Sequence, residues 1–213
     1  MEESRVWEKH MRKENLLVSL VAVYIAAELV SNATAGRLVQ IGPWVLPGAI
    51  FLYSLTFTLR DAVHTVGGWR VAKSLVWAGL AANALLALYG LLVTVLPKPA
   101  WFDGGAYAQV FGTTFRVVVA SLVAYGVSTW LDALVFERLK RSIASRVLAS
   151  NLVSTTLDTV VFITLAFAGT GAPLLNLMLG QVVVKMLVST VLIPLVYWVR
   201  NALRSQGLAL EGY

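Results

Sequence analysis

Six apolar stretches limit the fold of this chain more than any other feature, because each is close to the length of a membrane crossing. A helix that spans the hydrocarbon core of a bilayer needs about 20 mostly apolar residues. The stretches are Leu16–Leu38, Trp44–Leu59, Val71–Leu96, Val110–Phe136, Val147–Ala168 and Pro173–Val199. They predict an all-α fold, a bundle of six transmembrane helices.

The composition agrees that these stretches lie in lipid. Hydrophobic residues make up 58% of the 213 residues and charged residues only 13%, whereas a soluble domain carries about 25% charged residues. One small water-soluble core cannot bury so much apolar surface. The chain has no cysteine, which excludes a disulfide framework, a thiolate metal site and a cysteine nucleophile.

Short breaks separate the stretches, and none is long enough to divide the chain into two domains. The breaks contain Gly42-Pro43, Gly67-Gly68, Pro97-Lys98-Pro99, Asp103-Gly104-Gly105 and the run from Gly169 to Pro173. Because Pro43, Pro47 and Gly48 crowd the start of the second stretch, we expect that span to be tilted, broken or extended to about His64. We expect a cytoplasmic amphipathic segment over residues 1–15, a transmembrane domain over 16–199 and a cytoplasmic tail over 200–213.

Lysine and arginine gather on one side of the predicted bundle. Of 17 such residues, 13 flank the span ends on the side of the two termini, and 2, Arg37 and Lys98, lie on the other side. Cytoplasmic loops carry the excess of lysine and arginine in membrane proteins. We therefore expect a multi-pass protein of the cell (inner or plasma) membrane with both termini in the cytoplasm. The basic net charge then calls for no nucleic-acid partner.

Five ionisable residues lie inside the predicted spans: Glu28, Arg116, Asp132, Asp158 and Lys185. Each costs about 2.5–3.5 kcal/mol at the centre of a membrane helix. We therefore expect these side chains to face the interior of the bundle or a cavity, and to pair with one another. A purely structural ion pair between Asp158 and Lys185 is the alternative for those two residues, and snorkelling to the membrane surface is the alternative for Asp132.

Most of the polar side chains inside the predicted spans lie at a similar depth in the membrane. From the rise of 1.5 Å per helical residue, Glu28, Asn83, Tyr125, Asp158 and Lys185 fall within about 3 Å of the midpoints of their stretches. Arg116 falls about 12 Å toward the outside, and Asp132 a similar distance toward the cytoplasm. Polar groups from five helices at one level are typical of a substrate site at the bilayer midplane.

Helical spacing sorts the polar residues into one stripe on each of four helices. The stripes are Tyr24, Glu28 and Asn32; Ser121, Tyr125, Ser128 and Asp132; Asn151, Thr155, Asp158 and Phe162; and Gln181, Lys185 and Ser189. The serine and threonine hydroxyls alternatively bond carbonyls of their own helix. Asp61 and His64 are three residues apart, but no third metal ligand accompanies them, so we expect no metal site.

Enzyme motifs are absent from the sequence. The chain contains no His-Glu-x-x-His, no Gly-x-Ser-x-Gly and no P-loop. A small helical bundle with charged groups at its midplane therefore favours transport over catalysis, with no cofactor. An intramembrane enzyme and a structural assembly partner without a ligand are weaker alternatives.

Two runs of residues resemble a known family. The run over residues 116–140 contains Arg116, Ser121, Ala124, Tyr125, Ser128, Asp132, Phe136 and Lys140, and the next span contains Ser154, Thr155, Asp158, Thr159, Phe162 and Phe167. Both resemble adjacent spans of the queuosine precursor transporters, also called putative vitamin uptake transporters. Asn32 and Asp61 agree with that family as well. Where the family usually continues with Glu-Val-Tyr-Gly, this chain has Thr65-Val66-Gly67-Gly68.

The resemblance implies uptake of a 7-deazaguanine, such as 7-cyano- or 7-aminomethyl-7-deazaguanine, used in tRNA modification. A carboxylate accepts the adjacent N–H and NH₂ of a guanine-like edge, and aromatic rings stack on the base. The candidate substrate-binding residues are Asp158, Asp132, Arg116, Glu28, Asn32, Tyr125, Thr155, Phe162, Lys185 and Asn83. Proton coupling through Asp158 or Glu28 and facilitated entry with metabolic trapping both stay open.

A second reading is the substrate-binding S component of an energy-coupling factor vitamin transporter. Such components also have about six spans, and Ala22 and Ala26 match the small-residue pattern with which their first helix packs on a coupling subunit. The partners expected are a small molecule and the bilayer. Small residues such as Gly79, Ala82 and Gly126 suit either a homodimer or packing within one molecule.

Overall fold

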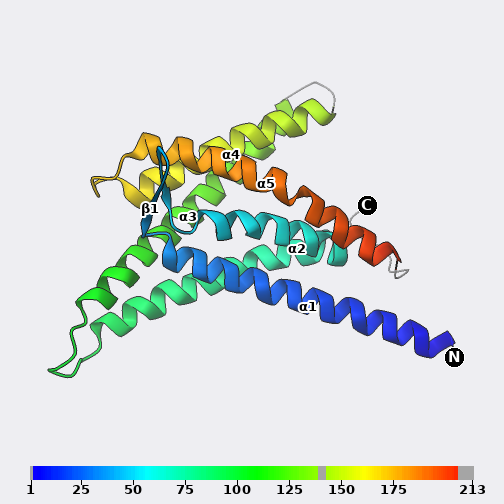
Figure 1. The fold of residues 1–213 in the computed structure, drawn as a ribbon, viewed down its shortest axis with the longest axis horizontal. Helices are drawn as coiled ribbons and strands as arrows, with labels where there is room; N and C mark the ends of the chain where they lie inside the picture. Colours follow the sequence, from blue (N-terminus) through cyan, green and yellow to red (C-terminus); the bar gives the residue numbers. More distant parts are fainter. Residues whose placement is uncertain (1, 139–142, 206–213) are drawn as a thin grey trace. The chain divides into compact units, whose positions relative to one another are not determined.

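The computed structural model describes residues 2–138 and 143–205, and most of them are helical (Figure 1). The elements are α1 (Glu2–Thr34), β1 (Leu38–Ile41), β2 (Trp44–Pro47), α2 (Ile50–Val95), α3 (Gly105–Arg138), α4 (Ile143–Phe167) and α5 (Leu174–Ser205). Three stretches are long and apolar enough to cross a membrane: Met11–Thr34, Ile50–Val95 and Gly105–Ser128. Thr155–Phe167 and Leu174–Val188 are shorter apolar helices. These findings confirm a mostly helical membrane protein.

A short β-hairpin, which the sequence did not predict, interrupts the otherwise helical fold. The strands β1 and β2 pair antiparallel with Ile41 opposite Trp44, so Gly42 and Pro43 form a two-residue turn. Gly42 has a φ of +57°, and two-residue hairpin turns need such a left-handed residue. The prediction that the second span begins at Trp44 was therefore wrong.

Proline and glycine explain why the helix does not begin earlier. Pro47 and Gly48 disfavour continuation of a helix through this point, and α2 starts at Ile50. The backbone N–H of Gly48 donates to the carbonyl of Arg37 at 2.7 Å, which closes the base of the hairpin. Helix α1 also ends at Thr34, before the predicted boundary at Leu38.

Helix α2 consists of two arms that meet at Gly68. Gly68 has φ 74° and ψ 179°, a backbone conformation that is essentially restricted to glycine. Helix α2 turns back on itself part-way along its length (Figure 1). The break expected at Gly67-Gly68 is therefore confirmed, and the helix continues past His64 as the second-span prediction allowed.

Contacts on both sides of Gly68 show that the two arms run side by side. Thr56 on the first arm and Asn83 on the second both reach the Glu28 side chain on α1. A straight helix would separate residues 56 and 83 by about 40 Å. Leu59 and Val63 on one arm also share a hydrophobic cluster with Leu75 on the other. The arms thus form a helical hairpin.

The described residues fall into two compact bodies. The first holds residues 2–31, 49–86 and 185–205, and its hydrophobic cluster contains Tyr24, Ala27, Leu59, Val63 and Leu75. The second holds residues 32–48, 87–138 and 143–184. Both α3 and the described part of α4 belong to the second body.

Packing of α3 against α4 forms much of the second body. Along α3, Val117, Ala120 and Ala124 are each 1% exposed, and Ser128 is buried on the same face. On α4, Ile163 and Thr159 are fully buried. Small side chains on α3 allow the two helices to approach closely, as is usual between membrane helices.

Helix α5 starts against the hairpin (Figure 1). The Asn176 side chain accepts a hydrogen bond from the backbone N–H of Val45 at 2.6 Å and donates one to the carbonyl of Pro43 at 3.0 Å. One turn later, a Cβ on Gly180 would lie 2.7 Å from Leu46 Cδ2. The hairpin therefore fixes both the height and the rotation of the first turns of α5.

Candidate functional site

Glu28 forms a polar cluster inside the first body. Asn83 Nδ2 donates to Glu28 Oε2 at 3.4 Å and to the carbonyl of Gly79 at 3.0 Å. The hydroxyls of Tyr24 and Thr56 also lie within hydrogen-bonding reach of the Glu28 carboxyl. Glu28 is turned toward protein, as the sequence predicted, and its partner Asn83 was not evident from the sequence. We call Glu28, Asn83, Tyr24 and Thr56 the Glu28 cluster.

Lys185 is a second charged group held within the first body. Its side chain is 5% exposed, and Nζ lies 5.6 Å from the centre of the Tyr53 ring on the first arm of α2. An ammonium group at this distance is attracted by the electron-rich face of the ring. Burial against protein was expected for Lys185, but the aromatic partner was not evident from its sequence position.

Arg116 binds the end of α4 within the second body. Its Nε donates to the carbonyl of Leu165 at 2.8 Å, and its Nη2 donates to the carbonyl of Ala168. The last carbonyls of a helix have no partner in the helix itself, and the helix dipole makes this end attractive to a cation. Arg116 was expected to pair with a carboxylate, whereas in the described structure it pairs with backbone carbonyls.

Thr170 completes the end of α4. The carbonyl of Phe167 accepts the backbone N–H of Thr170 at 3.2 Å and its hydroxyl at 2.7 Å. Gly169 and Gly171 both have a φ of +78°, which lets the chain turn sharply toward α5. Arg116 and Thr170 together provide donors for the carbonyls of Leu165, Phe167 and Ala168.

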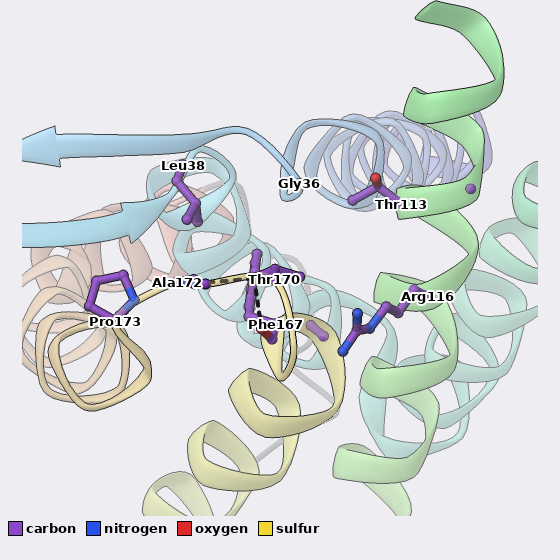
Figure 2. Close-up of a pocket in the computed structure, with 11 residues that line it drawn as sticks. Gly36, Leu38, Thr113, Arg116, Phe167, Thr170, Ala172 and Pro173 are labelled. Carbon is purple, nitrogen blue, oxygen red and sulfur yellow. Dashed lines mark hydrogen bonds between the residues drawn. The ribbon is translucent and has the colours of Figure 1, made fainter. Parts of the chain in front are cut away.

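A pocket of about 520 Å³ opens beside Arg116 (Figure 2). Small-molecule sites have volumes of about 300–1,000 Å³. Figure 2 shows Arg116 reaching from α3 toward Phe167 and Thr170 at the end of α4. The lining residues are Gly36, Leu38, Gly112, Thr113, Arg116, Ala166, Phe167, Thr170, Gly171, Ala172 and Pro173. Among them Arg116 alone carries a charge.

One face of α4 connects this pocket with predicted site residues. Thr155, Asp158 and Phe162 are all half-buried, and Ala166 of the pocket lies four residues beyond Phe162 on the same face. The Phe162 ring meets Phe167 edge to face, with 6.3 Å between ring centres. A molecule in the pocket would therefore find an aromatic side chain and then a carboxylate along α4.

Asn32 and Tyr125 differ in how well they fit the prediction. Asn32 is 6% exposed, and its Oδ1 accepts a long hydrogen bond of 3.5 Å from Ser121 Oγ on α3. Tyr125 is 37% exposed and points away from the buried face of α3.

The Asp132 side chain lies outside the described residues. Asp61 and His64 belong to no group of three or more metal-ligating side chains among the side chains that the structure describes.

Residues of the pocket wall were not evident from the sequence. Gly36 and Thr113 meet where the turn after α1 reaches α3 (Figure 2), and a Cβ on Gly36 would lie 2.3 Å from Thr113 Cγ2. The contact joins residues far apart in the sequence, so neither segment predicts it by itself. The hydropathy pattern also does not predict the hairpin that follows Gly36.

This contact gives a first prediction. Replacing Gly36 with alanine should destabilise the protein by about 1–3 kcal/mol, because the new methyl group overpacks the junction. Thr113→Ser in the same chain removes Cγ2 but keeps the hydroxyl that donates to the carbonyl of Gln109. The serine should therefore restore the melting temperature measured by thermal unfolding in detergent. A failure to restore it would contradict the contact.

Comparison with known proteins identifies the family. The model of the family described as "Putative vitamin uptake transporter" matches residues 47–199, more than half of the chain. The chain belongs to this family. Its members are transporters, not enzymes, as the sequence predicted, and the recognised resemblance is confirmed.

A named relative narrows the comparison. The chain is 29% identical over 157 residues to the "Probable queuosine precursor transporter" of Bacillus subtilis (strain 168). The match covers 68% of this chain and 68% of the relative. No solved structure matches the chain. Family and apolar helices together make it a multi-pass membrane protein with a small-molecule substrate.

Proposed function

We propose that this chain takes up a queuosine precursor, 7-cyano- or 7-aminomethyl-7-deazaguanine, or a similar nucleobase-like vitamin, across the cell membrane. The observation that carries the proposal is the similarity to a relative named for queuosine precursor transport. Buried polar groups on otherwise apolar helices support it, because they are too costly in a membrane without a function. Asp158, Arg116, Asn32, Thr155 and Phe162 would contact the substrate from the second body.

Six crossings with both termini in the cytoplasm complete the proposal. The 46 residues of α2 correspond to about 69 Å of helix, more than twice the thickness of the hydrocarbon core. Each of its two arms is therefore long enough for one crossing. Helices α1, α3, α4 and α5 add one crossing each. An even number returns the chain to its starting side. The pocket beside Arg116 then opens to the outside, where substrate arrives.

The α4 face suits a guanine-like ligand. The ring of Phe162 offers a stacking surface, and the carboxylate of Asp158 accepts the exocyclic NH₂ of the base. Tyr125 and Asp132 are further proposed binding residues of the second body, and Glu28, Asn83 and Lys185 are those proposed in the first. Proton coupling through Glu28 or Asp158 predicts uptake that a proton ionophore abolishes. Facilitated passage with metabolic trapping predicts uptake that the ionophore leaves unchanged.

A ligand titration tests the proposed function. The purified protein should bind 7-cyano- and 7-aminomethyl-7-deazaguanine saturably in calorimetry, and each ligand should raise the melting temperature. Guanine should bind more weakly, and thiamine should not bind. Binding of riboflavin or thiamine in place of the deazaguanines would retain vitamin transport but reject the queuosine precursor. Co-purification with an ATPase module would favour the S component instead.

Replacing Asp158 with asparagine tests the proposed main contact. The affinity for 7-cyano-7-deazaguanine should fall at least about tenfold, because a carboxylate accepts a hydrogen bond from the NH₂ more strongly than a neutral amide does. The melting temperature should change little, since the two side chains have nearly the same shape. Asp103→Asn is the matched control, because Asp103 lies in an exposed loop and accepts the N–H of Gly105. Equal affinity in both variants would reject Asp158 as a ligand contact.

A further inference from the structure

Gln181 on α5 carries a buried oxygen that the proposed function has not used. The side chain is 3% exposed, and its Oε1 is buried without a hydrogen-bond partner among the described residues. Leu177, one turn earlier on the same face, is fully buried. Gln181 therefore lies on the inner face of α5 and not at the lipid surface.

The fold holds this amide in place. Asn176 ties α5 to the hairpin through two hydrogen bonds, and Gly180 packs against Leu46 and Trp44. Gln181 follows Gly180 directly, so its direction is set about 100° around the helix from that docked face. The helix cannot rotate to bring the amide to a polar partner without breaking the contacts of Asn176.

Burial without a partner destabilises the ligand-free protein. A polar atom that loses its hydrogen bonds to water and gains none in return is a net cost to folding. In native proteins, buried polar atoms of this kind are rare, and each one calls for an explanation. An apolar residue at this position would avoid that cost.

We propose that Gln181 binds the substrate by pairing its side-chain amide with a cis-lactam edge, the adjacent N–H and C=O of a heterocyclic ring. This inference rests on the proposed function. A primary amide has an acceptor and a donor side by side. Oε1 accepts the lactam N–H, and Nε2 donates to the lactam carbonyl. The substrate class is therefore a planar heterocycle that retains the lactam, as 7-deazaguanines do.

The test combines a protein variant with a ligand variant. Gln181→Met replaces the amide with an apolar side chain of similar length. The ligands are 7-cyano-7-deazaguanine and its 6-deoxo analogue, which lacks both the carbonyl and the neighbouring N–H. In the unaltered protein, the 6-deoxo analogue should bind about tenfold to hundredfold more weakly. In Gln181→Met the two ligands should bind equally, because the group that distinguishes them is gone.

A second readout needs no ligand. Gln181→Met should keep or raise the melting temperature of the ligand-free protein, since it removes an unsatisfied polar group. Gln109→Met, on an exposed part of α3, is the matched control and should leave both ligand affinities unchanged. A melting temperature lowered by several degrees would overturn the inference, because the amide would then be satisfied without substrate.

The remaining outcomes separate the two proposals. If Gln181→Met still distinguishes the two ligands as the unaltered protein does, Gln181 does not read the lactam, and the proposed function stands. If the unaltered protein binds no deazaguanine at all, the proposed function fails and this inference fails with it. Equal binding of both ligands by the unaltered protein would overturn the inference alone.

Discussion

Replacing Gly68 with alanine should lower the melting temperature by about 2–12 °C, because a non-glycine residue costs about 1–3 kcal/mol in this backbone conformation. Alanine also favours helix, so it promotes a straight continuation of α2 in place of the turn. A straight α2 would separate Thr56 from Asn83 and dismantle the Glu28 cluster. We expect a lower yield of monodisperse protein and a loss of ligand binding. Thermal unfolding and size-exclusion chromatography measure these effects.

Gly112 provides the matched control for this prediction. It lies in α3, and a Cβ added there would meet no atom within 4 Å. Gly112→Ala should therefore be neutral or should stabilise the protein by about 0.5–1 kcal/mol, the usual gain within a helix. If Gly68→Ala unfolds at the same temperature as Gly112→Ala, the helical hairpin in α2 is not the structure of the folded protein.

Replacing Arg116 with glutamine should destabilise the protein by about 3 kcal/mol or more, because two hydrogen bonds from a charged group are lost. The carbonyls of exposed Leu165 and half-buried Ala168 would lose the guanidinium that joins them, since the glutamine side chain is too short to reach both. The end of α4 should then loosen, together with the turn through Thr170 that lines the pocket. We expect a fall of about 6–12 °C in melting temperature and weaker binding of 7-cyano-7-deazaguanine.

Arg116→Lys distinguishes charge from geometry. Lysine keeps the positive charge at the helix end but cannot hold two separate carbonyls as a guanidinium does. The melting temperature of Arg116→Lys should therefore lie between those of the unaltered protein and Arg116→Gln. Arg70→Gln is the control for loss of a positive charge, because Arg70 is exposed on α2. Equal stability of Arg70→Gln and Arg116→Gln would show that Arg116 does not hold α4.

The helical segments were predictable because apolar length and glycine-proline breaks are local signals. Gly67-Gly68 marked the turn in α2, and the loop from Gly169 to Pro173 separated α4 from α5 as expected. The hairpin was missed because Leu38–Ile41 and Trp44–Pro47 are short apolar runs. Runs this short do not distinguish a strand from the end of a spanning helix.

The partners of the polar residues were harder to predict than their burial. Charge and hydropathy indicate that Arg116 and Lys185 are turned toward protein, but not toward which groups. Arg116 contacts carbonyls about 50 residues away in the sequence, and Lys185 contacts an aromatic ring. Such contacts arise from tertiary packing and leave no pattern in either segment. The unsatisfied oxygen of Gln181 is evident only once its neighbours are known.

The single-residue turn at Gly68 also bears on how the chain enters the membrane during synthesis. Because no loop separates the arms of α2, the ribosome delivers both within a short time and with no water-soluble segment between them. On the proposed topology, in which each arm crosses the membrane, we expect the translocon to release the two arms as one paired unit. Chains truncated shortly after Gly68 should then remain accessible to protease, whereas chains extended past Val95 should become protected in one step.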